Sequence, residues 1–170
     1  MIDELSDMVQ DDRAVIIGVM TSPESIYLGE FLYHAIFQPP GAEPLPREVI
    51  YEPKIYSYIE NFGSKKGDCG VIADNGFVVG MAWTRIIPAY GHIDDETPEL
   101  AISVLPEYRG QGIGTRLLEF LFELLREDGY KQTSLSVQKI NPALRLYQRV
   151  GYKIIRENDE DFIMIKDLES

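Results

Sequence analysis

The sequence predicts an α/β domain (α+β in some schemes) in which a mixed β-sheet carries helices on both faces. Short β-branched runs and helical stripes follow each other in the order β, α, α, β, β, β, α, β, α, β, β. One segment, 112–128, is a long amphipathic helix. An Asn-Gly turn between two apolar runs adds an antiparallel hairpin, which makes the sheet mixed. With 170 residues, the chain 1–170 fits a single domain.

The first third of the chain predicts one strand and two helices. Residues 14–20 are apolar and β-branched, which indicates a strand. Ser22-Pro23 offers a helix start, and the apolar stripe over 25–38 predicts a helix that ends at the prolines of the loop 39–46. Apolar residues spaced along 47–62 predict a second helix, interrupted near Pro53.

The middle of the chain predicts three strands. The apolar runs 69–73 and 77–87 flank Asp74-Asn75-Gly76, and Asn-Gly supplies the positive φ angles of a tight hairpin turn. An acidic loop over 88–98 follows, and residues 99–105 predict the next strand.

The last third predicts the main helix, a short helix and three strands. Leucines on one face and charged residues on the other define the helix 112–128, and Gly129 suits its C-terminal end. Asn141-Pro142 predicts an N-cap followed by a short helix. The strands are expected at 133–137, 152–155 and 161–165.

Composition excludes several classes of protein. The formal charge of −12 repels phosphate backbones and makes nucleic acid an unfavourable partner, whereas cationic amines would be tolerated. The single cysteine suits a reducing compartment. The polar lead-in 1–12 lacks the features of a signal peptide, and no apolar stretch reaches the ~20 residues of a membrane span. We therefore expect a soluble, cytoplasmic protein with no membrane partner.

The segment Arg109-Gly110-Gln111-Gly112-Ile113-Gly114 carries the strongest functional signal. Its glycines let backbone approach a ligand at the start of the main helix, where free amides and the positive dipole end favour an anion. Arg109 adds a cation and Thr115 a hydroxyl donor. The physical prediction is a diphosphate-binding site, and the alternative is a tight turn without a ligand.

Two other phosphate-binding motifs fit this segment less well. A Walker A loop needs Lys and then Ser or Thr after its last glycine, but Thr115 follows Gly114 directly. A dinucleotide fingerprint places its third glycine one position later and an acidic residue at the end of the next strand, which ends here in Ser136-Val137-Gln138.

The segment resembles the pyrophosphate motif Gln/Arg-x-x-Gly-x-Gly/Ala of the GNAT acetyltransferase superfamily, with Arg109, Gly112 and Gly114 in register. The preceding strand 100–108 and the segment 141–152 are similar to further parts of that family. The resemblance implies a GNAT fold with six to seven strands. It also implies an N-acetyltransferase that uses acetyl-CoA as co-substrate, and it makes a homodimer an expectation.

The resemblance assigns a role to individual residues. A strand splayed from its neighbour would present backbone groups to the pantetheine arm, amides after Arg109 would hold the pyrophosphate, and Asn141 would bond the pantetheine region unless it is only an N-cap. The implied cofactor-binding residues are Ile102, Val104, Arg109, Gly110, Gln111, Gly112, Ile113, Gly114, Thr115 and Asn141.

Two residues are catalytic candidates under this resemblance. Tyr147 would be the general acid, because a phenol stays protonated at neutral pH and can donate to the departing thiolate; its alternative is a core aromatic. Glu99 would be the general base, directly or through water, and its alternative is a solvated charge at the end of a strand. Rivals for the base are His92, Asp94, Asp95 and Glu96.

Metal and thiol chemistry are not indicated. His34, His92 and Cys69 lack the spacing of a zinc site, so no metal is expected. Cys69 lies in an apolar strand and is interpreted as a packing residue.

The resulting hypothesis is transfer of an acetyl group from acetyl-CoA to the primary amine of a small molecule. The alternatives are a non-catalytic acyl-CoA-binding module, transfer of a different acyl group, and acetylation of a protein N-terminus or lysine. Acceptor specificity is expected in segments 20–67 and 88–98, where aromatic residues could line a pocket: Tyr27, Tyr33, Phe37 and Tyr51.

Overall fold

A seven-stranded mixed sheet forms the centre of the computed structural model, which describes residues 14–169. The expected lead-in 1–12 lies outside the described residues. The strands run in the order β1-β2-β3-β4-β5-β7-β6, and only β4 and β5 are parallel neighbours within the described chain. Their bounds are β1 Ile16–Val19, β2 Cys69–Asp74, β3 Val78–Arg85, β4 Glu99–Val104, β5 Gln132–Gln138, β6 Lys153–Glu157 and β7 Asp161–Asp167. The predicted class, mixed sheet and strand number are confirmed.

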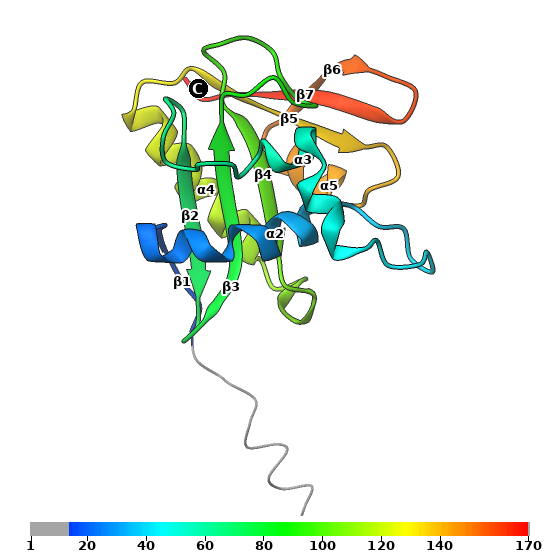
Figure 1. The fold of residues 1–170 in the computed structure, drawn as a ribbon. Helices are drawn as coiled ribbons and strands as arrows, with labels where there is room; N and C mark the ends of the chain where they lie inside the picture. The colour runs from blue at the N-terminus through cyan, green and yellow to red at the C-terminus, as the bar shows by residue number, and fades with distance from the viewer. Residues whose placement is uncertain (1–13, 170) are drawn as a thin grey trace, which may run out of the picture.

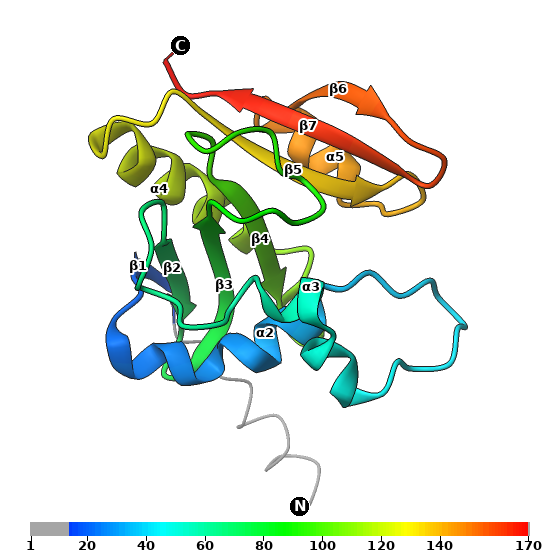
Figure 2. The same ribbon diagram turned by 45° about the horizontal axis from the view of Figure 1, so that its top comes forward.

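Helices cover both faces of the sheet, as predicted. Figure 1 shows α2 crossing in front of β2, β3 and β4, with α4 behind them, and Figure 2 shows the same two layers after rotation. In the part of the chain that the structure describes, no helix is long and apolar enough to cross a membrane. The helical segments are η1 Ser22–Tyr27, α2 Leu28–Ala35, η2 Arg47–Tyr51, α3 Pro53–Tyr56, η3 Pro106–Tyr108, α4 Ile113–Glu127 and α5 Leu144–Arg149.

Two apolar cores, one on each face, fix these layers. On one face, α4 buries the leucine stripe that predicted it against β2, β3 and β5. On the other, α2 buries Leu28, Phe31 and Leu32 against Ile72 and Trp83 of the hairpin strands. Large buried side chains of this kind contribute about 1.5–3 kcal/mol each, so the cores position both helices around β4.

The helix predicted over 25–38 is shorter and begins differently. Thr21 and Glu24 form a capping box, and a 3₁₀ segment runs from Ser22 through Tyr27 before α2 begins at Leu28. The helix ends at Ala35 because Ile36 has extended backbone angles. The predicted end at the prolines was therefore late by about one turn.

The interruption predicted near Pro53 is present, but the rest of the helix predicted over 47–62 is reduced to a 3₁₀ turn and one short helix. A 3₁₀ turn, η2, ends at Tyr51, and Glu52 is extended with ψ 129° before α3 begins at Pro53. Proline disfavours the helical conformation of the residue that precedes it, which breaks the segment at this point. After Tyr56 the chain continues in turns.

The end of β3 holds the turn-rich segment 57–68 against the sheet. The Arg85 side chain is 1% exposed and its guanidinium donates to both carboxylate oxygens of Asp68, at 2.9 and 3.1 Å. It also donates to the backbone carbonyls of Ser57 and Glu60, at 3.0 and 2.6 Å. Trp83 Nε1 donates to the carbonyl of Tyr58 at 2.9 Å. Side chains of β3 thus replace the regular backbone hydrogen bonds that the segment lacks.

Removal of the buried carboxylate should destabilise the whole domain. We expect Asp68→Ala to lower the free energy of unfolding by about 3–5 kcal/mol, because Arg85 would keep a buried charge without its partner. Urea denaturation measures this loss. The exposed pair between Lys139 and Glu157 supplies the control, since Lys139→Ala should cost at most about 1 kcal/mol. Similar losses in both variants would contradict the structural role of Arg85.

Candidate active site

The parallel strands β4 and β5 separate almost as soon as they meet. Within residues 14–169 they share one register pair, Glu99 with Ser134, supported by a 3.0 Å hydrogen bond from the Ser134 amide to the Pro98 carbonyl. Beyond this pair β5 continues along β7 instead. The predicted splay is therefore present, and the edge of β4 after Glu99 is left facing a gap.

The N-terminus of α4 opens into the same region. Gly112 is its N-cap with φ 79°, a left-handed conformation that favours glycine, and no side chain of the described residues caps the helix. A Cβ atom added at Gly110 or Gly112 would meet no heavy atom within 4 Å. Free amides, the positive dipole end and open space over the glycines make this turn a seat for an anion.

A cleft of about 850 Å³ joins the β4 edge, the α4 N-terminus and α5. Nearly all the residues predicted to hold a cofactor line it, together with the predicted acid. The lining residues from that set are Ile102, Val104, Arg109, Gly110, Gly112, Ile113, Gly114, Thr115, Asn141 and Tyr147. The side chain of Gln111 is outside the lining, and Glu99 is also outside it. The structure thus brings together segments that are about forty residues apart in the sequence.

The opposite wall of the cleft comes from the end of α2 and the following loop. Tyr33 and Phe37 lie there, as expected for acceptor-side aromatics, whereas Tyr27 and Tyr51 lie elsewhere and are exposed. The Tyr33 hydroxyl donates to the Leu45 carbonyl at 2.6 Å, which fastens the loop over this wall. Ser103 Oγ donates to the Phe31 carbonyl at 2.6 Å, so α2 is fixed directly to β4.

The arginines around the anion seat differ in what they contact. Arg109 Nε donates to the Val104 carbonyl at 2.9 Å, so this side chain also braces the end of β4. Arg149 of α5 lines the cleft, and its Nη2 lies 3.4 Å from Thr115 Oγ1 in the first turn of α4. The sequence analysis missed Arg149, because only tertiary packing brings α5 against the start of α4.

Asn141 does not cap α5 as predicted. The N-cap is Ala143, and α5 begins at Leu144. Asn141 Oδ1 instead accepts a hydrogen bond from the Ala143 amide at 2.9 Å, forming a turn two residues before the cap. The side chain is thereby held at the cleft wall.

Tyr147 combines cleft and core positions. Its ring packs edge-on against Tyr152 with centroids 5.9 Å apart, and the residue also lines the cleft. Burial raises the pKa of Tyr147 to about 12, so the phenol keeps its proton at any physiological pH. The core and functional interpretations of this residue are compatible.

Glu99 is not the solvated strand-end charge of the alternative interpretation. It is 2% exposed, and its Oε2 accepts hydrogen bonds from the Tyr58 hydroxyl and from the Gly91 amide, the latter at 3.0 Å. Burial raises the pKa of Glu99, whereas these donors and the nearby His92 and Lys54 oppose that rise.

The rival bases have different surroundings. Asp94, Asp95 and Glu96 are exposed, and His92 is partly exposed with its Nε2 3.9 Å from Asp95.

Burial raises the pKa of the Cys69 thiol to about 11, which keeps it protonated and fits the packing role expected of it. Within residues 14–169, no three His, Cys, Asp or Glu side chains converge as metal ligands.

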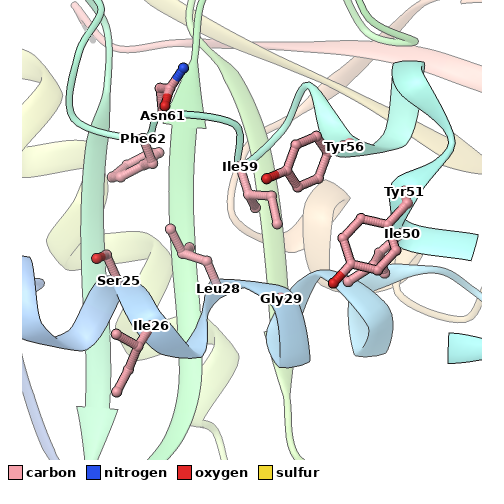
Figure 3. A pocket seen from close by; sticks show the side chains of 10 residues that line it. All are labelled: Ser25, Ile26, Leu28, Gly29, Ile50, Tyr51, Tyr56, Ile59, Asn61 and Phe62. Atoms are coloured by element: carbon pink, nitrogen blue, oxygen red, sulfur yellow. The ribbon is translucent and has the colours of Figure 1, made fainter. Parts of the chain in front are cut away.

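A second hollow of about 390 Å³ lies between α2 with its preceding 3₁₀ turn and segment 50–62. Figure 3 shows Tyr51 and Tyr56 from this segment beside Leu28 and Gly29 of α2. The two tyrosine rings have centroids 5.7 Å apart. None of the residues predicted to bind cofactor or to act in catalysis lines it.

The model of the acetyltransferase (GNAT) family matches residues 31–152, which include β4, the glycine turn and α5. The chain belongs to this family. It is 30% identical over 113 residues to the [ribosomal protein bS18]-alanine N-acetyltransferase of Haemophilus influenzae, covering 62% of this chain and 73% of that protein. The predictions of family, GNAT fold and acetyl-CoA-dependent N-acetyltransferase activity are confirmed.

Solved GNAT structures share the fold at low sequence identity. The ribosomal-protein-alanine N-acetyltransferase of Escherichia coli superposes with a TM-score of 0.64 at 20% identity, covering 92% of this chain and 96% of that one. The PaiA N-acetyltransferase of Thermoplasma acidophilum, in complex with coenzyme A, superposes with a TM-score of 0.66 at 20% identity, covering 91% and 99%.

A single substitution that adds a negative charge tests the anion seat at the start of α4 in this GNAT enzyme. We expect Gly112→Glu to weaken CoA binding at least about 100-fold (~2.8 kcal/mol), because a carboxylate and its bulk would occupy the seat. Titration calorimetry with CoA measures the change. Gly129 also has a positive φ, 88°, and lies beyond the other end of α4, so Gly129→Glu carries matched backbone strain. If both folded variants bind CoA equally well, the seat is assigned wrongly.

Proposed function

We propose that this GNAT enzyme transfers the acetyl group of acetyl-CoA to a primary amine, which attacks directly within a ternary complex. The observation that carries the proposal is the cleft. The open N-terminus of α4, the free edge of β4 and Tyr147 line one continuous space. An anion seat, an unpaired strand edge and an acid are thus available to one bound molecule.

The residues of the cleft fit the parts of acetyl-CoA. The amides of residues 110–115 would hold the diphosphate, with Arg149 as a neighbouring cation. Ile102 and Val104 would contact the pantetheine arm, and Asn141 would bond it from the α5 side. When bound, acetyl-CoA supplies an acyl carbon that is activated by its thiolate leaving group.

Tyr147 is the proposed general acid. Its phenol remains protonated because burial raises its pKa to about 12, and it lines the cleft on the α5 side. It would donate its proton to the sulfur as the C–S bond breaks, and the resulting thiol has the lower pKa, about 8.5. Burial of the ring against Tyr152 holds the donor in one place.

Glu99 is the proposed general base, and it acts through water. It lies three residues before Ile102 on β4 and does not itself line the cleft, so an intervening water would carry the proton. A raised pKa matches this carboxyl better to an ammonium donor.

Protons balance in this scheme. The ammonium nitrogen of the acceptor loses two protons as it forms its bond to the acyl carbon. One passes through water to Glu99 and then to solvent. The other restores the phenol of Tyr147 after that group has protonated the sulfur. The products are an amide and a free thiol.

The acceptor is proposed to be the amine of a small molecule, because the acceptor wall is compact and mostly uncharged. Tyr33, Phe37 and two prolines belong to it, and no Asp or Glu of the described residues lines the cleft. The Glu30 carboxylate of α2 is paired with His34 and Arg47. A protein N-terminus is the second candidate, because the Haemophilus influenzae relative carries the name of an enzyme that acts on the alanine of a ribosomal protein.

Parallel assays separate these acceptors. The enzyme is incubated with acetyl-CoA and one of three sets: small primary amines, peptides with a free N-terminal alanine, or N-blocked peptides with one lysine. Free thiol and product mass are recorded. Turnover with the small amines alone supports the proposal, whereas a preference for the alanine peptides of more than about tenfold in kcat/KM assigns the second function.

The role of Tyr147 predicts a separation of turnover from binding. Tyr147→Phe should lower kcat by about 10²–10⁴ and leave the Kd for CoA unchanged, because the phenol acts only when the thiolate departs. Stopped-flow thiol detection and calorimetry measure the two quantities. Tyr152→Phe removes a buried hydroxyl next to it and should leave kcat unchanged. An unaltered kcat in Tyr147→Phe removes this residue as the acid.

A further inference from the structure

The peptide of Gly91 bridges β4 and β5 at the one register pair that these strands share among the described residues. Its amide donates to Glu99 Oε2 at 3.0 Å, and its carbonyl accepts from Ser134 Oγ at 2.7 Å. Glu99 and Ser134 are the register pair of the two strands. The Gly91 peptide of loop 88–98 therefore links the side chains of Glu99 on β4 and Ser134 on β5. It does so where the backbone hydrogen bonds between these two strands end.

This bridge requires glycine because of close approach. A Cβ atom at Gly91 would lie 2.8 Å from the Leu135 carbonyl carbon and from the Ser136 nitrogen. It would also lie 3.1 Å from the carboxyl carbon of Glu99. Backbone atoms of β5 cannot move away cheaply, so any side chain here would push the loop off the carboxyl group.

Tyr58 approaches the same carboxyl oxygen from the other side. Its backbone carbonyl is held by Trp83, and its neighbour Ser57 is held by Arg85. The phenol donates to Glu99 Oε2, the atom that also accepts from Gly91. Oε1 is buried and has no hydrogen-bond partner among the described residues. Both protein donors thus converge on Oε2 and leave Oε1 without a donor from the described residues.

We propose that Tyr58 and Gly91 are positioning residues for the base Glu99: by binding Oε2 together, they fix the carboxylate and present Oε1 as the atom that receives the proton of the acceptor amine through the intervening water. This role rests on the proposed function of Glu99. The Tyr58 phenol is not itself a proton donor in the reaction, because burial and the adjacent carboxylate raise its pKa far above the ordinary value.

The groups around Glu99 determine in which direction its pKa moves when the Tyr58 hydroxyl is lost. His92 and Lys54 favour its ionised form, and Tyr90 lies beside both Tyr58 and Lys54. Arg85 is opposite Glu99 in the β3–β4 register but is engaged with Asp68. Hydrogen bonds to the carboxylate lower the pKa of Glu99, so loss of the Tyr58 hydroxyl raises it.

The experiment compares Tyr58→Phe with the wild-type enzyme by two measurements. The first is the titration midpoint of the Glu99 carboxyl carbon in ¹³C-glutamate-labelled protein, assigned with Glu99→Gln. The second is the acidic limb of kcat/KM against pH. Both should move up by about one to two pH units. The control, Tyr56→Phe, removes a hydroxyl from the same segment, in the hollow of Figure 3, and should move neither.

The outcomes distinguish this proposal from the function on which it rests. A folded Tyr58→Phe whose titration midpoint is unchanged overturns the positioning role and leaves Glu99 as a candidate base. A midpoint that moves without the kinetic limb overturns Glu99 as the base, and the positioning role with it. When both move and Tyr56→Phe moves neither, the proposal is supported.

Gly91→Ala supplies an independent variant on the other side of the carboxyl group. We expect kcat to fall at least about tenfold, with the Kd for CoA within a factor of two, because Gly91 lies outside the cleft lining. The Kd, measured by calorimetry, also reports whether the variant is folded. Unchanged kcat in a variant that binds CoA normally would contradict the role of Gly91.

Discussion

The early separation of β4 from β5 is the constraint on which the rest of the structure depends. A strand edge inside a sheet presents amides and carbonyls that need partners. At the first register pair those partners are the backbone of Pro98 and the side-chain bridge through Gly91. Further along, the edge faces the cleft. The candidate active site is therefore the place where neighbouring strands stop bonding to each other and leave backbone groups for a ligand.

The acceptor side depends in turn on the buried end of β3. Segment 57–68 lacks regular helix, and three of its backbone carbonyls, those of Ser57, Tyr58 and Glu60, accept hydrogen bonds from Trp83 or Arg85. Arg85 also gains the two oxygens of Asp68, which compensate for burial of its charge. Through Tyr58, this anchored segment reaches Glu99 on the neighbouring strand. Stability of the domain and orientation of the proposed base thus share the same few side chains.

The sequence predicted those parts whose physical signal is local. The leucine stripe defined α4, and glycines followed by an amphipathic helix indicated the anion seat. The break near Pro53 was predicted, but the extent of helix over 47–62 was overestimated, because short 3₁₀ turns have no lasting period. Arg149 and the Gly91 bridge depend on contacts between segments that no spacing rule relates. Glu99 was identified as a candidate base because it is a carboxylate at the end of a strand. Its burial could not be predicted, because it depends on tertiary packing.

The two ends of the cleft bind by different interactions, so pH is expected to affect them differently. At the α4 end, the diphosphate would be held by backbone amides, whose dipoles do not change with pH. Tyr147 also keeps its proton because its pKa is raised to about 12. Glu99, the proposed base, has to be ionised to act, and burial raises its pKa. Under the proposed mechanism, the enzyme's own contribution to the pH dependence of the rate therefore depends on the surroundings of this buried carboxyl group, which include Tyr58 and Gly91.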